Sequence, residues 1–445
     1  MNVTAVIAEY NPFHNGHLYQ LETIRQTQDA DIILIVLSGN FMQRGIPAIL
    51  DKYERCRMAL ENGADLVFEL PVYFALGSAE YFAQGAVSLL DKLGVVDTLH
   101  FGSESGDSSL LYELTDRMLA RESGAYKTAL NHYLKKGLSF PAARDSALCE
   151  LLPGQDVKSL VSAPNNILGI EYIKALIQRD STIKPVTVTR KGEGYASDSL
   201  AAGRFASANG IRKALFQPVD ADSLCSGYAG ANHRSAHNAH PSACIENHVP
   251  PSVYARLRSN QFLCTHDFSE MLLYKLLQDK NHAAHPHKDA FAAYYDIGPQ
   301  LSHTLYNNLP QYTDFDGFAQ LCKTRNLTYT RICRGLMHIL LDMTQENAEA
   351  LKNRDYAQYA RLLGFTARGM ELLKTIKANA SIPVITKPAS ALRQLAGAAQ
   401  MSLRADIHAA DIYHSVLQQK HLRMSKPPAN AVRQNELTCQ VIKLS

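Results

Sequence analysis

The chain has 445 residues, of which 46% are hydrophobic and 20% are charged, and its formal net charge at pH 7 is +3. A chain of this length and composition can bury a large core and is expected to form more than one domain, which excludes wholesale disorder. The small positive charge permits a nucleic-acid partner but does not require one.

The eight cysteines form no C-x-x-C pair, which indicates free thiols in a reducing compartment. The N-terminal sequence lacks the basic region and the cleavage site of a signal peptide. No apolar stretch reaches the roughly 18 residues that a membrane span needs. We therefore expect a soluble, cytoplasmic protein with no membrane partner.

The first half of the chain alternates between short apolar runs and helical patterns. Strands are predicted over residues 3–8, 32–37, 66–70, 98–101 and 185–189. Helices are predicted over residues 17–26, 51–62, 79–93 and 167–177. Continuous apolar strands separated by helices indicate a parallel sheet covered on both faces. The ligand of such a doubly wound domain is expected beyond the carboxyl ends of the strands, where the strand order reverses.

The composition changes near residue 220. Residues 226–250 are mostly small and polar and are predicted to form a loop. Beyond them the pattern is mostly helical, with helices predicted over residues 267–278, 314–323, 330–343, 355–363 and 368–378. We therefore divide the chain into an α/β domain over residues 1–220, a loop or insertion over 221–250 and a helical domain over 251–445.

The strongest local signal is NPFHNGH, residues 11–17, between the first strand and its helix. Gly16 lets the backbone approach a phosphate, and the helix N-terminus offers free N–H groups and a positive dipole end. His14 and His17 can donate hydrogen bonds to phosphate oxygens and, if protonated, offset the charge of a pyrophosphate leaving group. An ordinary turn that holds two histidines is the alternative.

The position of this segment favours phosphate binding, because H-x-G-H at a first strand-to-helix turn is typical of nucleotidyltransferases. No Walker A sequence occurs in the chain. The predicted fold class is α/β: a Rossmann-like nucleotidyltransferase domain with a parallel sheet, followed by a mainly α-helical C-terminal domain.

A second phosphate-binding segment is predicted at residues 207–213. Ser207 is a suitable N-cap for a helix, and nucleotidyltransferases of this type commonly carry an I-S-[ST]-x-x-[IL]-R segment that holds the β- and γ-phosphates. Here Asn209 replaces the usual hydroxyl residue. Arg190 and Lys191 add positive charge at the end of the last predicted strand, although a solvated turn would explain them equally well.

A basic stretch lies in the second half of the chain. Residues 323–341 hold four cations and no acidic residue, with Tyr329 among them. Such a pattern suits a phosphate backbone and an unstacked base. A helix with a solvated basic edge is the alternative, and both interpretations can hold together. The candidate RNA-binding residues are Lys323, Arg325, Tyr329, Arg331 and Arg334.

Histidines and a cysteine also gather within the polar stretch, as His233, His237, His240, Cys244 and His248. Their spacing matches no structural zinc pattern, so we predict a loop and no metal site there. The same holds for His282, His285 and His287.

Longer runs of the sequence resemble one bacterial family, the tRNA(Met) cytidine acetate ligases. The matching runs in the first half are NPFHNGHLYQL, LSGNFMQRG, FELPVYFALGSAEYFAQGAV, LHFGSESG, PNNILGIEYIKAL and FASANGIRKAL. Those in the second half are KTRNLTYTRICRGLMHILL and RLLGFTARGMELLK. The resemblance covers most of the chain and is far more specific than H-x-G-H alone.

The resemblance implies an enzyme that uses ATP and acetate to form acetyl-adenylate. The acetyl group then passes to N4 of the wobble cytidine of elongator tRNA(Met), giving N4-acetylcytidine, and no DNA partner is expected. We expect His14, His17 and Arg190 to supply charge during adenylation and Mg2+ to bridge the phosphates, although no acidic pair stands out as its ligand. An unstacked anticodon base suits the second step.

The resemblance also implies which residues contact ATP. Of the adjacent asparagines one is expected to do so, with Asn165 preferred over Asn166. The residues that the resemblance implies are Ile7, Ala8, Glu9, Tyr10, Asn11, Pro12, Phe13, His14, Asn15, Gly16, His17, Leu18, Tyr19, Gln20, Gly102, Asn165 or Asn166, and Arg190. Lys191, at the strand end, and Ser207, at the helix cap, complete the expected set.

Two other functional classes remain open at this point. A small-molecule adenylyltransferase or adenylate-forming ligase of cofactor biosynthesis would explain the first half but would leave the basic stretch without a function. An RNA-binding protein with a regulatory nucleotide site would bind ATP without turning it over.

Overall fold

The structure is a computed structural model that describes residues 1–121, 124–138, 140–151, 160–161, 163–189, 205–216, 243–282, 289–423 and 434–444. Arg190, Lys191 and most of the 221–250 segment, including His233, His237 and His240, lie outside the described residues. So do His285 and His287.

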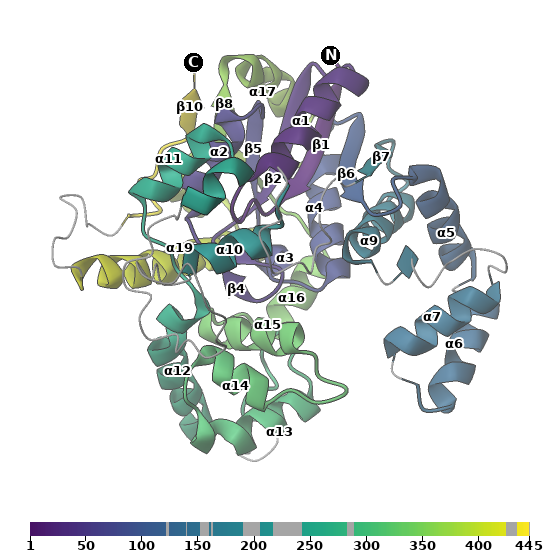
Figure 1. Cartoon of the computed structure of the whole chain (residues 1–445), viewed down its shortest axis with the longest axis vertical. Helices are drawn as coiled ribbons and strands as arrows, with labels where there is room; N and C mark the ends of the chain where they lie inside the picture. Colours follow the sequence, from purple (N-terminus) through teal and green to yellow (C-terminus); the bar gives the residue numbers. More distant parts are fainter. Residues whose placement is uncertain are drawn as a thin grey trace.

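A single large sheet organises the molecule (Figure 1). Among the described residues it has eight strands, in the order β10-β8-β5-β2-β1-β6-β7 with β9 paired to β8. All neighbours are parallel except β5 and β8. The strands are β1 (Val3–Ala8), β2 (Ile32–Ser38), β5 (Leu66–Leu70), β6 (Thr98–Ser103), β7 (Lys184–Thr189), β8 (Ala360–Thr366), β9 (Val384–Ile385) and β10 (Ile442–Leu444).

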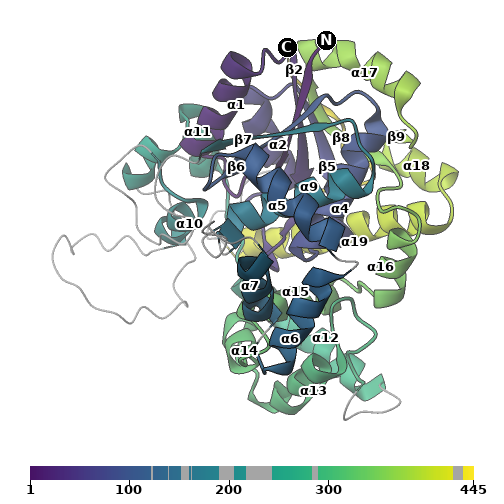
Figure 2. The ribbon, with the colours of Figure 1, turned by 90° about the vertical axis from the view of Figure 1, so that its right-hand side faces the viewer.

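Helices cover both faces of this sheet, as the apolar strands predict (Figure 2). In β2, Ile32 and Leu34 pack into one core while Ile33 and Ile35 pack into the other, and all four are fully buried. The helices of the first half are α1 (Asn15–Thr27), α2 (Lys52–Glu61), α3 (Val72–Ala75), α4 (Ala79–Leu93), α5 (Ser108–Arg121), α6 (Ala125–Lys135), α7 (Phe140–Leu151), α9 (Pro164–Gln178) and α10 (Ala208–Phe216). The bounds predicted for α4 are confirmed, and Gly94 ends it in the left-handed conformation, with φ of 66°.

The second half is mainly helical, with α12 to α15 below the sheet and α17 at its top in Figure 1. Its α-helices are α11 (Pro251–Ser259), α12 (Ser269–His282), α13 (Pro299–Asn308), α14 (Phe315–Leu321), α15 (Tyr329–Leu340), α16 (Gln345–Lys352), α17 (Ala367–Asn379), α18 (Pro388–Gln394) and α19 (Gly397–Leu422). Three short 3-10 helices are also described: η2 (Ala243–His248), η3 (Thr265–Phe268) and η4 (Leu309–Gln311). The predicted fold class is confirmed: a mostly parallel α/β sheet with a helical C-terminal part.

The helix predicted over residues 355–363 is wrong. Asp355 and Tyr356 have φ of 61°, which ends the preceding helical turn. The chain then enters β8, a strand that pairs with β5 on one side and β10 on the other. The sheet therefore includes strands from both halves of the sequence.

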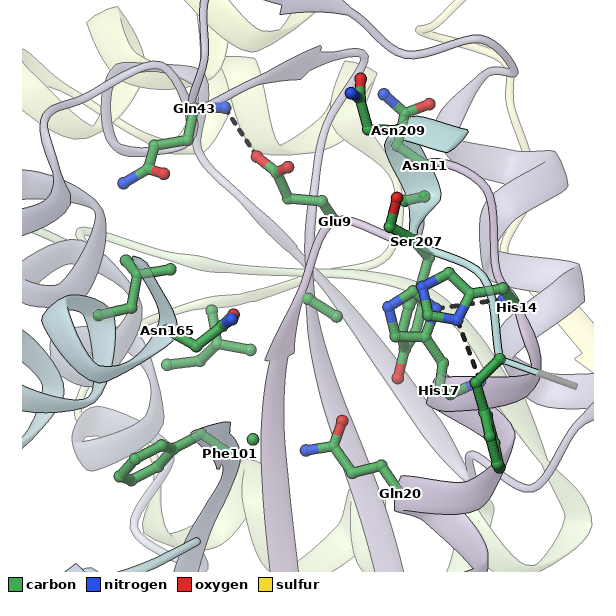
Figure 3. A pocket seen from close by; sticks show the side chains of 18 of the residues that line it. Glu9, Asn11, His14, His17, Gln20, Gln43, Phe101, Asn165, Ser207 and Asn209 are labelled. Carbon is green, nitrogen blue, oxygen red and sulfur yellow. Dashed lines mark hydrogen bonds between the residues drawn. The ribbon is translucent and has the colours of Figure 1, made fainter. Parts of the chain in front are cut away.

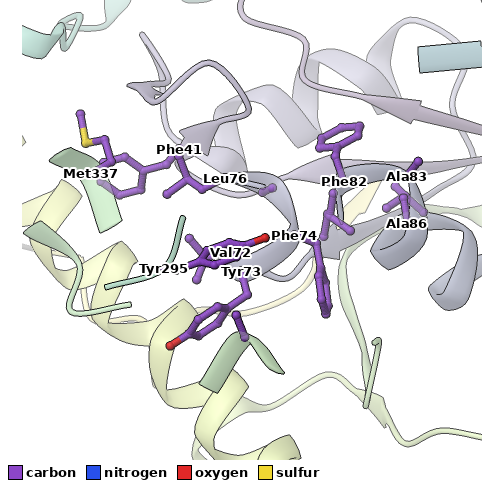
Figure 4. Packing of buried hydrophobic residues seen from close by; sticks show 14 of the residues in the cluster. Phe41, Val72, Tyr73, Phe74, Leu76, Phe82, Ala83, Ala86, Tyr295 and Met337 are labelled. Atoms are coloured by element: carbon purple, nitrogen blue, oxygen red, sulfur yellow. The ribbon is translucent and has the colours of Figure 1, made fainter. Parts of the chain in front are cut away.

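A continuous core also joins the two halves (Figure 4). Tyr295 and Met337 from the second half lie among Phe41, Tyr73 and other side chains of the first. His338 bridges the same contact, with one ring nitrogen 3.0 Å from the Leu76 carbonyl and the other 2.7 Å from the Tyr295 carbonyl. The helical part is thus fixed against the loops that follow the strands.

Candidate functional site

A cavity opens at the carboxyl ends of the strands, where the order reverses between β1 and β6 (Figure 3). This is the position predicted for a ligand of a doubly wound sheet. Residues of the ends of β1, β6 and β7, the start of α1, the N-terminal turn of α9 and the start of α10 line it. Of the expected ATP-contacting residues, the lining includes Ile7, Ala8, Glu9, Tyr10, Asn11, His14, Gly16, His17, Tyr19, Gln20, Gly102, Asn165 and Ser207.

His14 and His17 form the N-terminal cap of α1. The Gly16 N–H donates to Nδ1 of His14 at 3.0 Å, and the His14 N–H donates to Nδ1 of His17 at 3.2 Å. The two rings stack with centroids 3.7 Å apart. A nitrogen that accepts a hydrogen bond does not carry the ring proton, so in this arrangement both rings are neutral with the proton on Nε2.

The histidines therefore suit hydrogen-bond donation through Nε2 more than charge neutralisation. A protonated ring would lose its Nδ1 bond to the backbone. The positive potential at this point comes instead from the N-terminus of α1.

Helix α10 brings a second set of polar groups to the cavity. Ser207 caps it, since its hydroxyl accepts the Gly210 N–H at 3.0 Å. Arg212 lines the cavity one turn further on and donates to the Asn11 carbonyl at 2.6 Å. Asn209, which replaces the usual hydroxyl residue, also lines the cavity. The two phosphate-binding segments predicted from the sequence thus meet across one space.

The adjacent asparagines have different surroundings. Asn165 lines the cavity, and its side-chain amide donates to Glu104 at 2.7 Å. Asn166 is 2% exposed, and its side-chain oxygen accepts the N–H groups of Glu104 at 3.0 Å and Ser105 at 3.2 Å. Asn166 therefore shapes the loop after β6, and Asn165 is the one of the two that lines the cavity.

Other expected ligand-contacting residues are not brought to the cavity. Phe13 is fully buried in the core beside Tyr10, and Leu18 packs against the same core. Pro12 is buried in the turn. Asn15 turns away to donate to the Asn247 carbonyl of η2 at 2.8 Å, which anchors the end of the segment predicted to be a loop or insertion.

The hairpin that follows the end of β2 also reaches the cavity. Gln43 and Arg44 line the cavity from the tip of this hairpin, between β3 (Phe41–Met42) and β4 (Ile46–Pro47). Arg55, fully buried on α2, donates to the carbonyls of Glu9 at 2.7 Å and Ser38 at 3.0 Å and so ties together the ends of β1 and β2. Its spacing on α2 gives no sign of this, because both acceptors are backbone atoms distant in sequence.

The basic stretch lies beside this hairpin. Gly45, with φ of 74°, packs so closely on α15 that an added Cβ would lie 2.3 Å from the Arg334 backbone nitrogen. Arg331 and Arg334 lie 3.4 and 3.1 Å from the carboxylate of Asp296. Lys323 and Arg325 are exposed, and no ion pair is found for either among the residues described.

Tyr329, the aromatic residue of the basic stretch, is held by contacts on its core side. The Tyr329 hydroxyl donates to Asp316 at 2.8 Å, and its ring packs against the core. This leaves it half-buried, so the exposed cations are better placed than Tyr329 for contact with a large partner.

The comparisons agree with this geometry. A family model described as HIGH Nucleotidyl Transferase matches residues 1–427. The tRNA(Met) cytidine acetate ligase of Halothermothrix orenii is 36% identical over 425 residues, covering 93% of this chain and 94% of its own length. That of Clostridium acetobutylicum is 37% identical, covering 87% of this chain and 90% of its own. The chain belongs to the tRNA(Met) cytidine acetate ligase family.

Solved structures support the same family assignment. The crystal structure of Thermotoga maritima TmcAL bound with alpha-thio ATP is 28% identical, covers both chains completely and aligns with a TM-score of 0.82. The apo form of the same protein aligns with a TM-score of 0.83. Family membership therefore extends over the sheet, the cavity and the helical part alike.

Proposed function

We propose that this chain is an ATP-dependent ligase that activates acetate as acetyl-adenylate and acetylates N4 of the wobble cytidine of elongator tRNA(Met). The observation that carries the proposal is the cavity at the reversal of strand order, where two stacked histidines cap α1. A relative that aligns along the whole chain binds an ATP analogue. The named relatives are tRNA(Met) cytidine acetate ligases. Their name is the basis for proposing tRNA(Met) as the acetyl acceptor and acetate as the acid.

In the first half-reaction an acetate oxygen attacks the α-phosphorus, and the bond to the pyrophosphate oxygen breaks. His14 and His17 would donate from Nε2 to oxygens that gain charge, and Arg212 would add positive charge from α10. Asn165 would hold the nucleotide at the opposite wall. Arg190 and Lys191 are proposed to assist on the grounds of the sequence alone, since they lie outside the described residues.

Mg2+ is proposed to enter together with ATP. No group of three or more His, Cys, Asp or Glu side chains is placed as a metal site in the described part of the chain. Mg2+ in such enzymes is commonly held by substrate phosphates with few protein ligands, which the donor set here fits. When bound, the ion would offset phosphate charge.

The tRNA is proposed to contact the surface of Lys323 and Arg325, which precede α15, the helix that packs on the hairpin reaching the cavity. Arg331 and Arg334 would support that surface through Asp296, with Tyr329 below it. No helix among the described residues is long and apolar enough to cross a membrane. A tRNA substrate and the free cysteines of the described part of the chain favour the cytoplasm as the site of action.

Purified protein with ATP, radiolabelled acetate and elongator tRNA(Met) tests the function. Label in the tRNA, dependent on ATP, is expected. Pyrophosphate exchange that depends on an acid other than acetate, with no label in tRNA, would instead indicate a small-molecule adenylate-forming enzyme. ATP binding without turnover in any mixture would indicate an RNA-binding protein.

The histidine assignment has its own test. His17→Ala is expected to lower acetate-dependent ATP–pyrophosphate exchange by about 100-fold, since it removes a donor aimed at the developing charge. His132→Ala, which changes an exposed histidine on α6, is the matched control. Full exchange activity in His17→Ala would contradict the phosphate-binding role.

A further inference from the structure

Glu9 is the one carboxylate among the described residues that line the cavity. It follows the last residue of β1, and Arg55 holds its backbone carbonyl at 2.7 Å. Its Oε1 accepts the Gln43 N–H at 2.7 Å, while Oε2 has no partner among the residues described. The side chain is therefore fixed at one oxygen with the other left to a ligand.

The position of Glu9 separates it from the nucleotide-holding groups. In Figure 3 it extends towards Gln43, at the end of the cavity away from Gln20 and Phe101. His14 and His17 lie along another wall. Glu9 thus lies at the hairpin side of the cavity, and the hairpin packs on α15.

A carboxylate beside a polyphosphate is repelled by it, so the charge of Glu9 needs the partners that this cavity supplies. Burial raises the pKa of Glu9, while the Gln43 N–H and the nearby Arg212, Arg44 and Arg55 act in the opposite direction. The net effect makes it a stronger proton acceptor than an exposed glutamate.

The two half-reactions differ in their need for a base. Acetate is already deprotonated near neutral pH, so its attack on phosphorus releases no proton. The exocyclic amine of cytosine must lose one when it becomes an amide. A general base in this site is therefore needed only in the second half-reaction.

Resting on the proposed function, we propose that Glu9 is the general base for acetyl transfer to the cytosine amine. The N4 lone pair forms a bond to the acetyl carbonyl carbon, and the bond between that carbon and the AMP phosphate oxygen breaks. AMP leaves with the electron pair, and the N4 proton passes to Glu9 Oε2 and then to water. No oxidant, reductant or further reactant is needed.

The test separates the half-reactions in Glu9→Gln, which keeps the side-chain shape and its acceptor for the Gln43 N–H. Acetate-dependent ATP–pyrophosphate exchange is expected to fall at least about 10-fold less than transfer, because Glu9 is also among the residues expected to contact ATP. Single-turnover transfer from preformed acetyl-adenylate to tRNA(Met) is expected to fall by about 100-fold to 10,000-fold, the usual contribution of a general base. Glu9→Asp, which retains a carboxylate, is expected to recover part of the rate.

The pH dependence of transfer gives a second readout. In the unchanged protein the transfer rate is expected to rise with pH as Glu9 loses its proton and then to level off, and this rise is expected to be absent in Glu9→Gln. Wild-type transfer rates in Glu9→Gln would overturn the proposal. Equal loss of exchange and transfer would also overturn it and would place Glu9 on ATP or its metal ion. Failure of the unchanged protein to label tRNA would instead refute the proposed function.

Discussion

At the scale of single residues, this site depends on side chains that satisfy the backbone and face the ligand at once. The Nδ1 atoms of His14 and His17 complete the N-terminus of α1, which fixes the proton on the opposite nitrogen. Residue types alone could suggest charged histidines, but only the hydrogen bonds decide the tautomer. The same pair thus stabilises a helix and is positioned to bind phosphate.

Asn165 and Asn166 offer a matched pair of substitutions at this scale. Asn165→Ala is expected to raise the KM for ATP by about 3-fold to 10-fold, because it removes one neutral hydrogen bond, with little change in stability. Asn166→Ala is expected to lower the free energy of unfolding by about 1–3 kcal/mol, because it leaves buried N–H groups of the β6 loop unsatisfied. Steady-state kinetics and urea unfolding would measure both, and a reversed pattern would contradict the assignment.

At the scale of elements, local patterns predicted those strands and helices whose apolar run, periodicity or cap lies within their own residues. The apolar run of β2 and the capped helix α4 are such cases. The helix predicted over residues 355–363 rested on a local pattern alone, and it overlaps the first residues of β8. The actual partners of β8 are β5 and β10, which are distant in sequence, so pairing outweighs local preference.

In the candidate site, too, features set by local sequence were predictable and features set by distant contacts were not. Strand ends and the H-x-G-H segment were predictable because a parallel sheet places its loops at one edge. Arg55 was not, because its contacts with backbone carbonyls depend on how α2 folds over that edge. Gly45 shows the coupling most directly, since its contact with α15 depends on a positive φ and on a helix far along the chain.

The basic stretch around α15 leads to a prediction about elements. Lys323→Ala and Arg325→Ala are each expected to weaken tRNA binding and to reduce the slope of log affinity against log salt by about 0.7–0.9, because each removes one phosphate contact. Filter binding over a salt series measures this, with the exposed Lys374→Ala on α17 as the control.

Arg334→Ala is expected to act differently. It removes a partner of Asp296 where α15 meets the hairpin, so thermal stability should fall while the salt slope stays nearly unchanged. If Arg334→Ala alone changed the slope and the two exposed cations did not, the RNA surface would have to be moved to the buried edge of α15.

At the scale of the whole molecule, a buried ion cluster joins segments from both ends of the chain. Lys52 on α2 lies 2.7 Å from Glu69 on β5, and Arg361 on β8 lies 3.1 Å from Glu69 and 2.7 Å from Glu436. Lys52 also pairs with Glu436. The side chains are at most 4% exposed, so their charges balance away from water. The C-terminal segment is thereby held to the sheet next to β10.

Glu436→Gln is therefore expected to destabilise the whole fold by about 3–5 kcal/mol, because it leaves an uncompensated positive charge in the interior. Burial alone would raise the pKa of Glu436, but Lys52 and Arg361 lower it to about 2. Because the folded pKa lies below the unfolded value of 4.5, this contribution is complete above pH 4.5 and is lost as the pH falls towards 2. The unchanged protein should lose stability across that range more steeply than Glu436→Gln. Urea unfolding at several pH values measures this, with the exposed Glu371→Gln on α17 as control. Equal stabilities of Glu436→Gln and Glu371→Gln at neutral pH would contradict the stabilising role of Glu436.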